Sequence, residues 1–236
     1  MAGHSEKDYI RSMVQKVLQG LQWRVCVMNW RGFNSALKST LVSCFADISD
    51  MERVFKYVEA RYPGAPIYAI GFSMGSNQLV KYLGKHDGKH KVLAAVSVCN
   101  GFEYESNINR VESTTIGQLV HSRGGTYLHQ EYLRTQGEEL KKMGADLDLE
   151  KALAATTHSE FDQACFPLYA QWGYADLKSY LADIDSRPYV PKISIPVLCI
   201  QSADDPLYSG LPTGRCGSEC MGWRDKCLGL IPMPND

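Results

Sequence analysis

The sequence predicts an α/β protein built on a mostly parallel sheet with helices on both faces. Strand patterns and helical patterns alternate through the first hundred residues, as they do when crossover helices join parallel strands. The apolar run "PIYAIGF" passes directly into a helical pattern, and a last apolar run, "IPVLCIQS", returns after a long helical stretch. With 236 residues, the chain is long enough for one sizeable domain.

The N-terminal elements follow from their periodicity. Residues 8–21 are expected to form an amphipathic helix, because apolar side chains recur every three or four positions, at Ile10, Met13, Val14, Val17, Leu18 and Leu21. The run "WRVCVMNW" (23–30) is rich in strand-forming residues and is predicted to be a buried strand. After the polar loop "RGFNSALKS", an apolar stripe predicts a helix over 45–62, which Pro63-Gly64 ends.

The remaining elements complete the sheet. Strands are predicted over 66–72, 91–100 and 195–202, with a helix from about 74 to 83 after the first of them. The stretch 102–190 is polar and helical, and we expect it to be an insertion over the carboxyl ends of the strands, where open α/β sheets bind ligands.

The bulk composition excludes several classes of protein. A net charge of −1 gives no reason to expect a nucleic-acid partner. No apolar run is long enough to span a membrane, and the N-terminus lacks the apolar core of a signal peptide. Cys26, Cys99 and Cys199 lie within apolar runs, which indicates buried free thiols in a reducing compartment.

A serine between two glycines marks the candidate active site. Gly71, Ser73 and Gly75 form a G-x-S-x-G pattern at a predicted strand-to-helix junction. Such a junction exposes the serine hydroxyl in a strained turn, and the flanking glycines are expected to avoid collisions. The helix also points backbone N–H groups at the reacting centre, so that of Met74 is the candidate oxyanion donor. The alternative is a glycine-rich turn that allows close packing or binds a phosphate.

A carboxylate follows the last predicted strand, at the same edge of the sheet. "SADDPLY" offers Asp204 and Asp205, and we prefer Asp205 because it precedes Pro206 where the loop turns. The alternative is an ordinary Asp-Pro turn.

The general base is the missing part of this arrangement. In this fold the order along the chain is serine, acid, histidine, but none of the six histidines follows Asp205. We expect His86 and His90 to face solvent, and His121, His129 and His158 to be surface residues of the insertion; His4 lies in an N-terminal loop.

The motifs taken together resemble a known family. "DYIRSMV", "NWRGFNSA", "ARYPGAPIYAIGFSMGSNQLVKYLG", "EFDQACFPLYAQWGYADLKSY" and "IPVLCIQSADDPLY" occur in the order found in the α/β-hydrolase superfamily, in particular AB hydrolase family 4. The resemblance runs from about residue 3 to 207. It implies Ser73 as nucleophile and Asp205 as triad acid. It also implies hydrolysis of acyl esters, often of lipids, without metal or cofactor.

The chain departs from this family in three places. Ser76 stands where relatives usually have glycine. Relatives begin with further strands, one of which lies in the sheet between the strands matching 23–30 and 66–72 and precedes a second oxyanion donor. After "DDPLY" they continue with another strand, the histidine and a helix, whereas residues 209–236 match nothing in the family. We therefore expect a partial hydrolase domain over 1–208, truncated at both ends, with a divergent, unstructured tail over 209–236.

Two functions of different class follow. The first is a serine esterase acting on a small-molecule or lipid ester, cytoplasmic or held at a membrane by an anchor in a longer product. The second is a catalytically inactive, non-enzymatic chain that lacks the triad histidine. A nucleotide-binding domain is a less well supported hypothesis than either of these, because the glycine-rich dinucleotide-binding pattern and the P-loop pattern are missing. A zinc site also has little support from the sequence, since the spacing of Cys216, Cys220 and Cys227 in the tail is unusual and no fourth ligand is evident.

Overall fold

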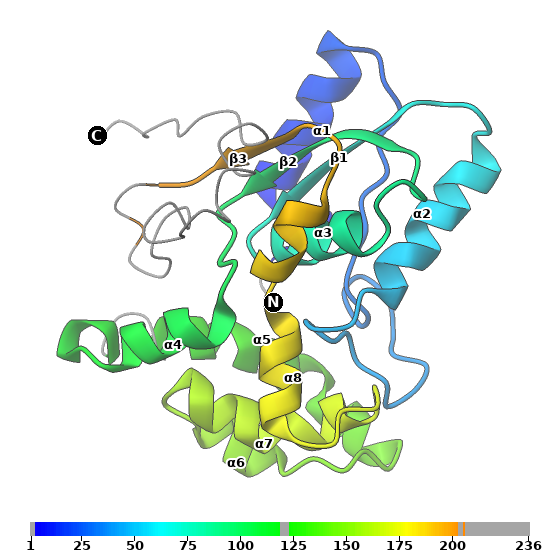
Figure 1. The fold of residues 1–236 in the computed structure, drawn as a ribbon. Helices are drawn as coiled ribbons and strands as arrows, with labels where there is room; N and C mark the ends of the chain where they lie inside the picture. Colours follow the sequence, from blue (N-terminus) through cyan, green and yellow to red (C-terminus); the bar gives the residue numbers. More distant parts are fainter. Residues whose placement is uncertain (1–2, 119–122, 203–204, 206–236) are drawn as a thin grey trace.

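A parallel sheet forms the centre of the fold in the computed structural model, which describes residues 3–118, 123–202 and 205. Within these residues the strands are β1 (Ile67–Phe72), β2 (Val92–Val98) and β3 (Val197–Ile200), in the order β1-β2-β3 (Figure 1). Both pairings are parallel, which confirms the predicted sheet.

The strand register brings three chain segments to one edge of the sheet. Phe72 of β1 pairs with Val98 of β2, and Val98 pairs with Ile200 of β3. The residues that follow each strand therefore leave the sheet side by side. Parallel strands lie about 4.8 Å apart, so segments following β1 and β3 are roughly 10 Å apart.

Three helices lie in the first part of the chain, as the alternating pattern predicts. They are α1 (Asp8–Gly20), α2 (Ser49–Arg61) and α3 (Met74–Lys85). Helix α3 packs on one face of β1 and β2, and α2 packs against α3. The apolar core between α3 and the sheet includes Leu79, Leu83, Ala95, Val197 and Cys199, all buried.

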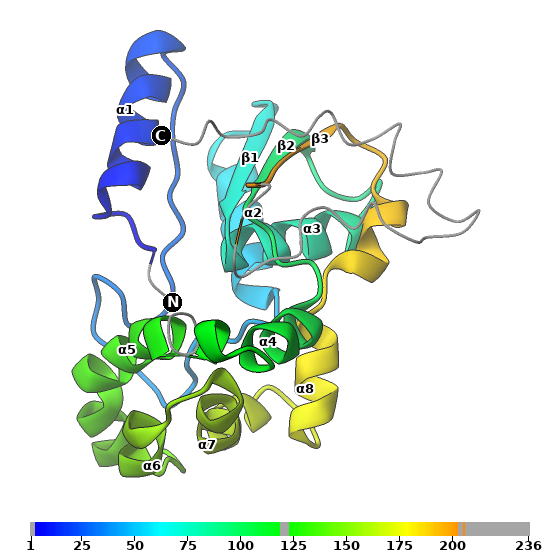
Figure 2. The same cartoon turned by 90° about the vertical axis from the view of Figure 1, so that its left-hand side faces the viewer.

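The predicted insertion is helical and forms a second apolar core. It contains α4 (Tyr104–Glu112), α5 (Arg123–Lys142), α6 (Leu149–Ala154), α7 (His158–Ala170), α8 (Leu177–Ile184) and the 3₁₀ helix η2 (Arg187–Lys192). Helices α4 to α8 gather on one side of the sheet, as Figures 1 and 2 show. Phe45, which precedes α2, is buried among the insertion's Leu133, Phe161 and Leu168. The insertion is therefore packed against the loop that leads into α2.

The prediction of a strand over 23–30 was wrong. These residues are extended but belong to no ladder, and residues 21–27 are exposed. Figure 2 shows α1 and this segment standing beside β1, apart from the rest of the sheet. A strand forms only where a neighbouring edge supplies hydrogen-bond partners, and no described strand lies between this segment and β1.

The burial expected at the N-terminus is also missing. No residue of α1 is buried, although the helix has the predicted bounds to within one residue. Cys26, predicted to be buried, is exposed, and Cys99 is only partly covered, whereas Cys199 is buried as expected. The apolar faces of α1 and of 23–30 therefore have no core beneath them in the described residues.

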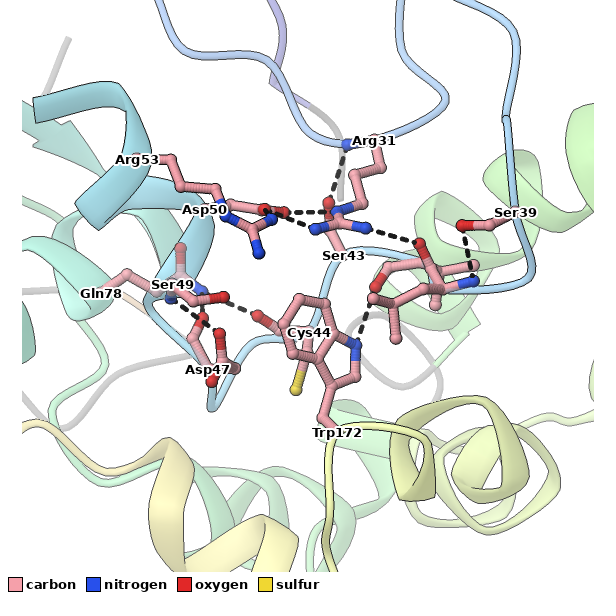
Figure 3. Close-up of polar contacts among 12 residues, drawn as sticks. Arg31, Ser39, Ser43, Cys44, Asp47, Ser49, Asp50, Arg53, Gln78 and Trp172 are labelled. Carbon is pink, nitrogen blue, oxygen red and sulfur yellow. Dashed lines mark hydrogen bonds and ion pairs between the residues drawn. The ribbon is translucent and has the colours of Figure 1, made fainter. Parts of the chain in front are cut away.

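Helix α3 carries buried polar side chains that bind the backbone of other elements. The amide of Gln78 donates to the carbonyl oxygens of Cys44, Phe45 and Asp47, at 2.8, 3.1 and 2.9 Å. Figure 3 shows Gln78 reaching this turn from α3. These three carbonyls belong to no helix or strand, and buried carbonyl oxygens need hydrogen-bond donors. The Gln78 side chain supplies those donors for the whole turn.

Two more residues of α3 donate hydrogen bonds to the last carbonyl oxygens of α8. Lys81 donates to the carbonyl oxygen of Ala46 at 2.6 Å and to that of Asp183, and its ammonium pairs with the Asp183 carboxylate at 2.7 Å. Asn77 donates to the carbonyl of Ile184 at 2.8 Å. The last carbonyls of a helix lack internal donors and attract cations, so these contacts fix α8 against α3. Burial lowers the pKa of Lys81, and Asp183 opposes that shift.

An arginine clamp holds the loop between the extended segment and α2. Arg31 makes two parallel contacts of 2.6 Å with the Asp50 carboxylate, and its backbone N–H donates to the Ser43 hydroxyl at 2.7 Å (Figure 3). The guanidinium lies over the ring of Trp172, 5.1 Å from the ring centroid, and the Trp172 indole N–H donates to the Val42 carbonyl at 3.0 Å. Such bidentate pairs are directional, so the clamp sets the path of the loop as it meets the insertion.

Replacing Lys81 with methionine tests the contact between α3 and α8. The Lys81→Met variant should lose about 2–3 kcal/mol of unfolding free energy, because it leaves buried carbonyls without a donor, while the partly exposed Asp183 rehydrates. Urea unfolding measures the change. Lys142→Met, which removes an exposed lysine paired with Glu139 at 3.5 Å, should change stability by less than about 0.5 kcal/mol. Equal effects of the two substitutions would contradict the role assigned to Lys81.

Candidate active site

Ser73 occupies a strained backbone conformation at an exposed position. It lies between the end of β1 and the start of α3, with φ 51° and ψ −122°. Its N–H donates to the Val98 carbonyl at 2.8 Å, and its own carbonyl accepts from the N–H groups of Ser76 at 3.0 Å and Asn77 at 3.1 Å. A positive φ at a residue other than glycine costs free energy and persists only where neighbouring contacts impose it. Here both flanking elements impose it.

The two flanking glycines have different roles. A Cβ added at Gly71 would lie 2.5 Å from the Cα of Ser76 and 2.7 Å from the carbonyl oxygen of Gly75, so only glycine fits. A Cβ at Gly75 would meet no described atom within 4 Å. The expectation that both positions need very small residues is therefore correct for Gly71 and wrong for Gly75.

A hydroxyl pair joins the start of α3 to β2. Ser76 and Ser97 are both buried, with 3.1 Å between their hydroxyl oxygens. A buried hydroxyl needs a partner, and each supplies the other's. This contact explains why a serine fits at position 76, where the family that the sequence resembles usually has glycine.

Met74, the first residue of α3, has a backbone N–H without an acceptor inside the helix, and its side chain is apolar. Backbone N–H groups in the first turn of a helix have no acceptor within the helix, so that of Met74 faces outward from the N-terminus. The side chain packs against the apolar core of the insertion. The N-terminus of α3 can therefore receive an anionic oxygen next to an apolar surface.

Asp205 follows β3 and is partly exposed. Its carboxylate lies near Cys99, which directly follows β2: burial raises the pKa of the Cys99 thiol, and the charge of Asp205 adds to that shift. Ser73, Cys99 and Asp205 thus follow three adjacent strands at one edge of the sheet. Asp204, Pro206 and the turn after them lie outside the described residues.

The loops after β2 and β3 are joined by a side chain. The Asn100 N–H donates to Oε1 of Gln201 at 2.6 Å, and Nε2 of Gln201 donates back to the Asn100 carbonyl at 2.9 Å. Both residues are buried. Beyond them, Phe102 accepts at its carbonyl from the N–H groups of Ser186 at 3.0 Å and Arg187 at 3.3 Å. The entrance and exit of the insertion are therefore tied to each other and to the segment that leads to Asp205.

Five histidines are described, and each has contacts elsewhere. His86 lies 2.7 Å from the Glu52 carboxylate, beyond the C-terminus of α3, and the His4 ring stacks on Phe33. His129 and His158 meet edge to face in the insertion, with 5.3 Å between ring centroids. His158 is buried rather than on the surface as predicted, and burial lowers its pKa to about 4. His90 is likewise not solvent-facing, because both its ring nitrogens are covered. His121 lies outside the described residues.

The "EFD" segment of the insertion has a structural explanation. Glu160 accepts from the Thr156 N–H at 2.8 Å, Phe161 is buried, and Asp162 accepts from the Tyr104 hydroxyl at 3.0 Å. Asp162 is 3% exposed, and this burial raises its pKa to about 7. The burial of this carboxylate could not be predicted from its neighbours in the sequence, because its partner, Tyr104, is 58 positions away.

The described residues contain no cluster of three or more histidine, cysteine or carboxylate side chains placed to hold a metal ion. Cys216, Cys220 and Cys227 lie outside them. Among the helices that the structure describes, none has the length and apolarity needed to cross a bilayer.

Comparison with known proteins identifies the class. The family model described as alpha/beta hydrolase fold matches residues 1–209. This chain therefore belongs to the α/β-hydrolase fold family, which confirms the resemblance at the level of the superfamily.

Several curated relatives carry lipase names. Phospholipase ABHD3 of Homo sapiens is 29% identical over 206 residues, which are 87% of this chain and 49% of that protein. Monoacylglycerol lipase of Saccharomyces cerevisiae is 26% identical over 217 residues, 89% of this chain and 47% of that protein. Monoacylglycerol lipase ABHD2 of Homo sapiens is 28% identical over 221 residues, 88% and 50% respectively. The chain spans about half the length of these relatives.

Substituting the two glycines separates their roles. Gly71→Ala should cost about 1–3 kcal/mol of unfolding free energy, because the added methyl group forces α3 away from β1. Gly75→Ala should be neutral or stabilise by up to about 1 kcal/mol, since it adds a helix-favouring side chain in open space. Chemical denaturation of both variants measures the difference. A larger loss for Gly75→Ala than for Gly71→Ala would contradict the geometry of the turn.

The burial of Asp162 predicts a pH dependence of stability. Because its pKa in the folded state lies above the ordinary value of 3.8, its contribution is most favourable below that value and is lost as the pH rises through about 7. Asp162→Asn keeps an acceptor for Tyr104 but cannot ionise. The variant should therefore gain stability over the parent as the pH rises from 4 to 8, by about 4 kcal/mol at most.

Thermal unfolding across this pH range tests the prediction. The exposed Asp146→Asn variant is the control and should run parallel to the parent. A pH-independent difference between Asp162→Asn and the parent would show that Asp162 does not titrate in the expected range.

Proposed function

We propose that this chain is a serine hydrolase of acyl esters, with Ser73 as the nucleophile. The observation that carries the proposal is the backbone of Ser73, an exposed serine held at φ 51° between a parallel strand and the N-terminus of a helix. A phosphate-binding turn would need glycine flexibility and backbone donors but no strained serine. This strain favours a role for the hydroxyl itself.

The geometry supports the following chemistry. Oγ of Ser73 attacks the ester carbonyl, forming a tetrahedral intermediate whose oxyanion accepts a hydrogen bond from the Met74 N–H. The positive end of the α3 dipole favours the same charge. Asp205 follows a strand two places away from the one before Ser73, and the segments leaving these strands are roughly 10 Å apart, which is room enough for an imidazole between the serine and the carboxylate. In this assignment Asp205 orients that imidazole and stabilises its charged form.

A lipid acyl ester is the proposed substrate class. The curated relatives named above are a phospholipase and monoacylglycerol lipases. In this chain Met74, which directly follows the exposed serine, packs against the apolar core of the insertion. An apolar surface next to the nucleophile favours an acyl chain over a polar substrate. No cofactor is needed for this chemistry.

No residue is assigned as the general base in this proposal. The contacts of His4, His86, His129 and His158 assign each of these rings to another part of the molecule, so none is proposed as the base. An inactive chain is therefore the competing function. It differs from the hydrolase in a measurable way, because a serine without a base does not react with an activated phosphonate at an enzymatic rate.

A fluorophosphonate probe distinguishes the two functions. The hydrolase function predicts one probe per chain, attached at Ser73 and located by peptide mass mapping, whereas a chain without a base predicts none. Ser73→Ala should abolish labelling, and Asp205→Asn should slow it by about 10²–10⁴-fold. Ser113→Ala, a change at an exposed serine beyond α4, should label like the parent. Equal labelling of Ser73→Ala and parent, or no labelling of either, would exclude the hydrolase function for this chain.

A further inference from the structure

Asn77 lies one helical turn after the candidate nucleophile and is almost fully buried. Its backbone N–H donates to the carbonyl oxygen of Ser73 at 3.1 Å, so the first turn of α3 fixes its position relative to the nucleophile. The residue is only 3% exposed. A polar side chain buried this deeply has given up its hydrogen bonds to water, so the groups that it contacts inside the protein decide what it does.

The Asn77 side chain holds two groups with one nitrogen. Nδ2 donates to the Ile184 carbonyl oxygen at 2.8 Å, at the end of α8, and to the thioether sulfur of Met74 at 3.6 Å. Because a carbonyl oxygen can only accept, the nitrogen of the amide must face Ile184, and the same nitrogen then faces the sulfur. Within the part of the chain that the structure describes, Oδ1 of Asn77 has no hydrogen-bond donor. The amide is therefore anchored through Nδ2.

Met74 connects this anchor to the nucleophile. It directly follows the exposed Ser73, and its side chain is half-buried against the apolar core of the insertion. A methionine side chain has three rotatable bonds and adapts to many surroundings, so it presents a fixed surface only where neighbouring groups hold it. Here the Asn77 N–H holds the sulfur, and the core that includes Ile184 supplies the packing.

We propose that Met74 is a specificity-determining residue for the acyl chain and that Asn77 is its positioning residue. This inference rests on the proposed hydrolase function. An acyl chain attached at Ser73 begins beside the side chain of Met74, and an apolar surface there favours contact with the chain. Because Asn77 already fixes that side chain, contact with a longer chain costs little further conformational entropy. The pair therefore favours longer acyl chains over short ones.

The competing explanation is that Asn77 only ties α3 to α8. Lys81 separates the two explanations, because it donates to Asp183 in the last turn of α8 and to Ala46, whereas Asn77 also contacts Met74. If the tie to α8 is all that matters, Lys81→Met and an Asn77 variant should affect the reaction alike. A positioning residue should change the chain-length preference, and Lys81→Met should not.

The chain-length preference measures the effect of both residues. The readout is the ratio of kcat/KM for p-nitrophenyl octanoate to that for p-nitrophenyl butanoate, in which losses common to both esters cancel. Met74→Ala should lower this ratio by about 3–10-fold, because the apolar contact with the longer chain is lost. Asn77→Leu keeps a side chain of similar size but cannot donate, and it should lower the ratio by about 2–5-fold. Lys81→Met should keep the ratio of the parent.

A double variant tests whether Asn77 acts through Met74. In Met74→Ala there is no thioether to hold, so adding Asn77→Leu should leave the ratio at the value of Met74→Ala. A further fall would show that Asn77 acts by another route and is not the positioning residue of Met74. Circular dichroism and thermal unfolding check that each variant is folded. Asn77→Ala, which removes the amide without adding bulk, takes the place of Asn77→Leu if the leucine variant does not fold.

The outcomes separate this inference from the proposed function. No hydrolysis by the parent, or hydrolysis that Ser73→Ala leaves unchanged, would exclude the hydrolase function and this inference with it. Hydrolysis that depends on Ser73 but has the same ratio in the parent, Met74→Ala and Asn77→Leu would overturn this inference and leave the hydrolase function standing. An equal fall of the ratio in Lys81→Met and Asn77→Leu would overturn the positioning of Met74 by Asn77.

Discussion

The buried polar side chains of α3 are the interactions on which the arrangement of the rest depends. Asn77, Gln78 and Lys81 lie within about one turn of each other on this helix and donate to carbonyl oxygens of two other segments. One segment is the turn before α2, and the other is the C-terminus of α8. Neither can satisfy these carbonyls through its own backbone. The helix that follows Ser73 therefore joins the sheet to the insertion through directional contacts, not through apolar packing alone.

This arrangement explains how the site can hold a strained serine. The cost of a positive φ at Ser73 is of order 1–3 kcal/mol, and it must be offset by contacts that would be lost if the turn relaxed. The N–H bond to Val98, the close approach of Gly71 to Ser76 and the hydroxyl pair of Ser76 with Ser97 fix the turn from the sheet side. The polar contacts of α3 fix it from the helix side.

The elements that could be predicted from the sequence are those whose signals are local. The strands at Ile67, Val92 and Val197, the helix after Ser73 and the helical insertion all follow from periodicity and from glycine placement. The segment 23–30 has an equally strong local pattern, yet it forms no strand, because a strand also needs an edge to pair with. The buried Asp162 and Lys81 could not be predicted either, since their partners are distant in sequence and a charged residue alone favours the surface.

The pairing of Gln201 with Asn100 gives the insertion a mechanical connection to the sheet edge. The amide of Gln201 reproduces, with a side chain, the two bonds that one more residue of a ladder would make. Asn100 is the point at which the chain leaves for the insertion, and Gln201 begins the path to Asp205. Because these two residues hold each other, the start of the insertion and the segment that leads to Asp205 keep one spacing at this edge of the sheet.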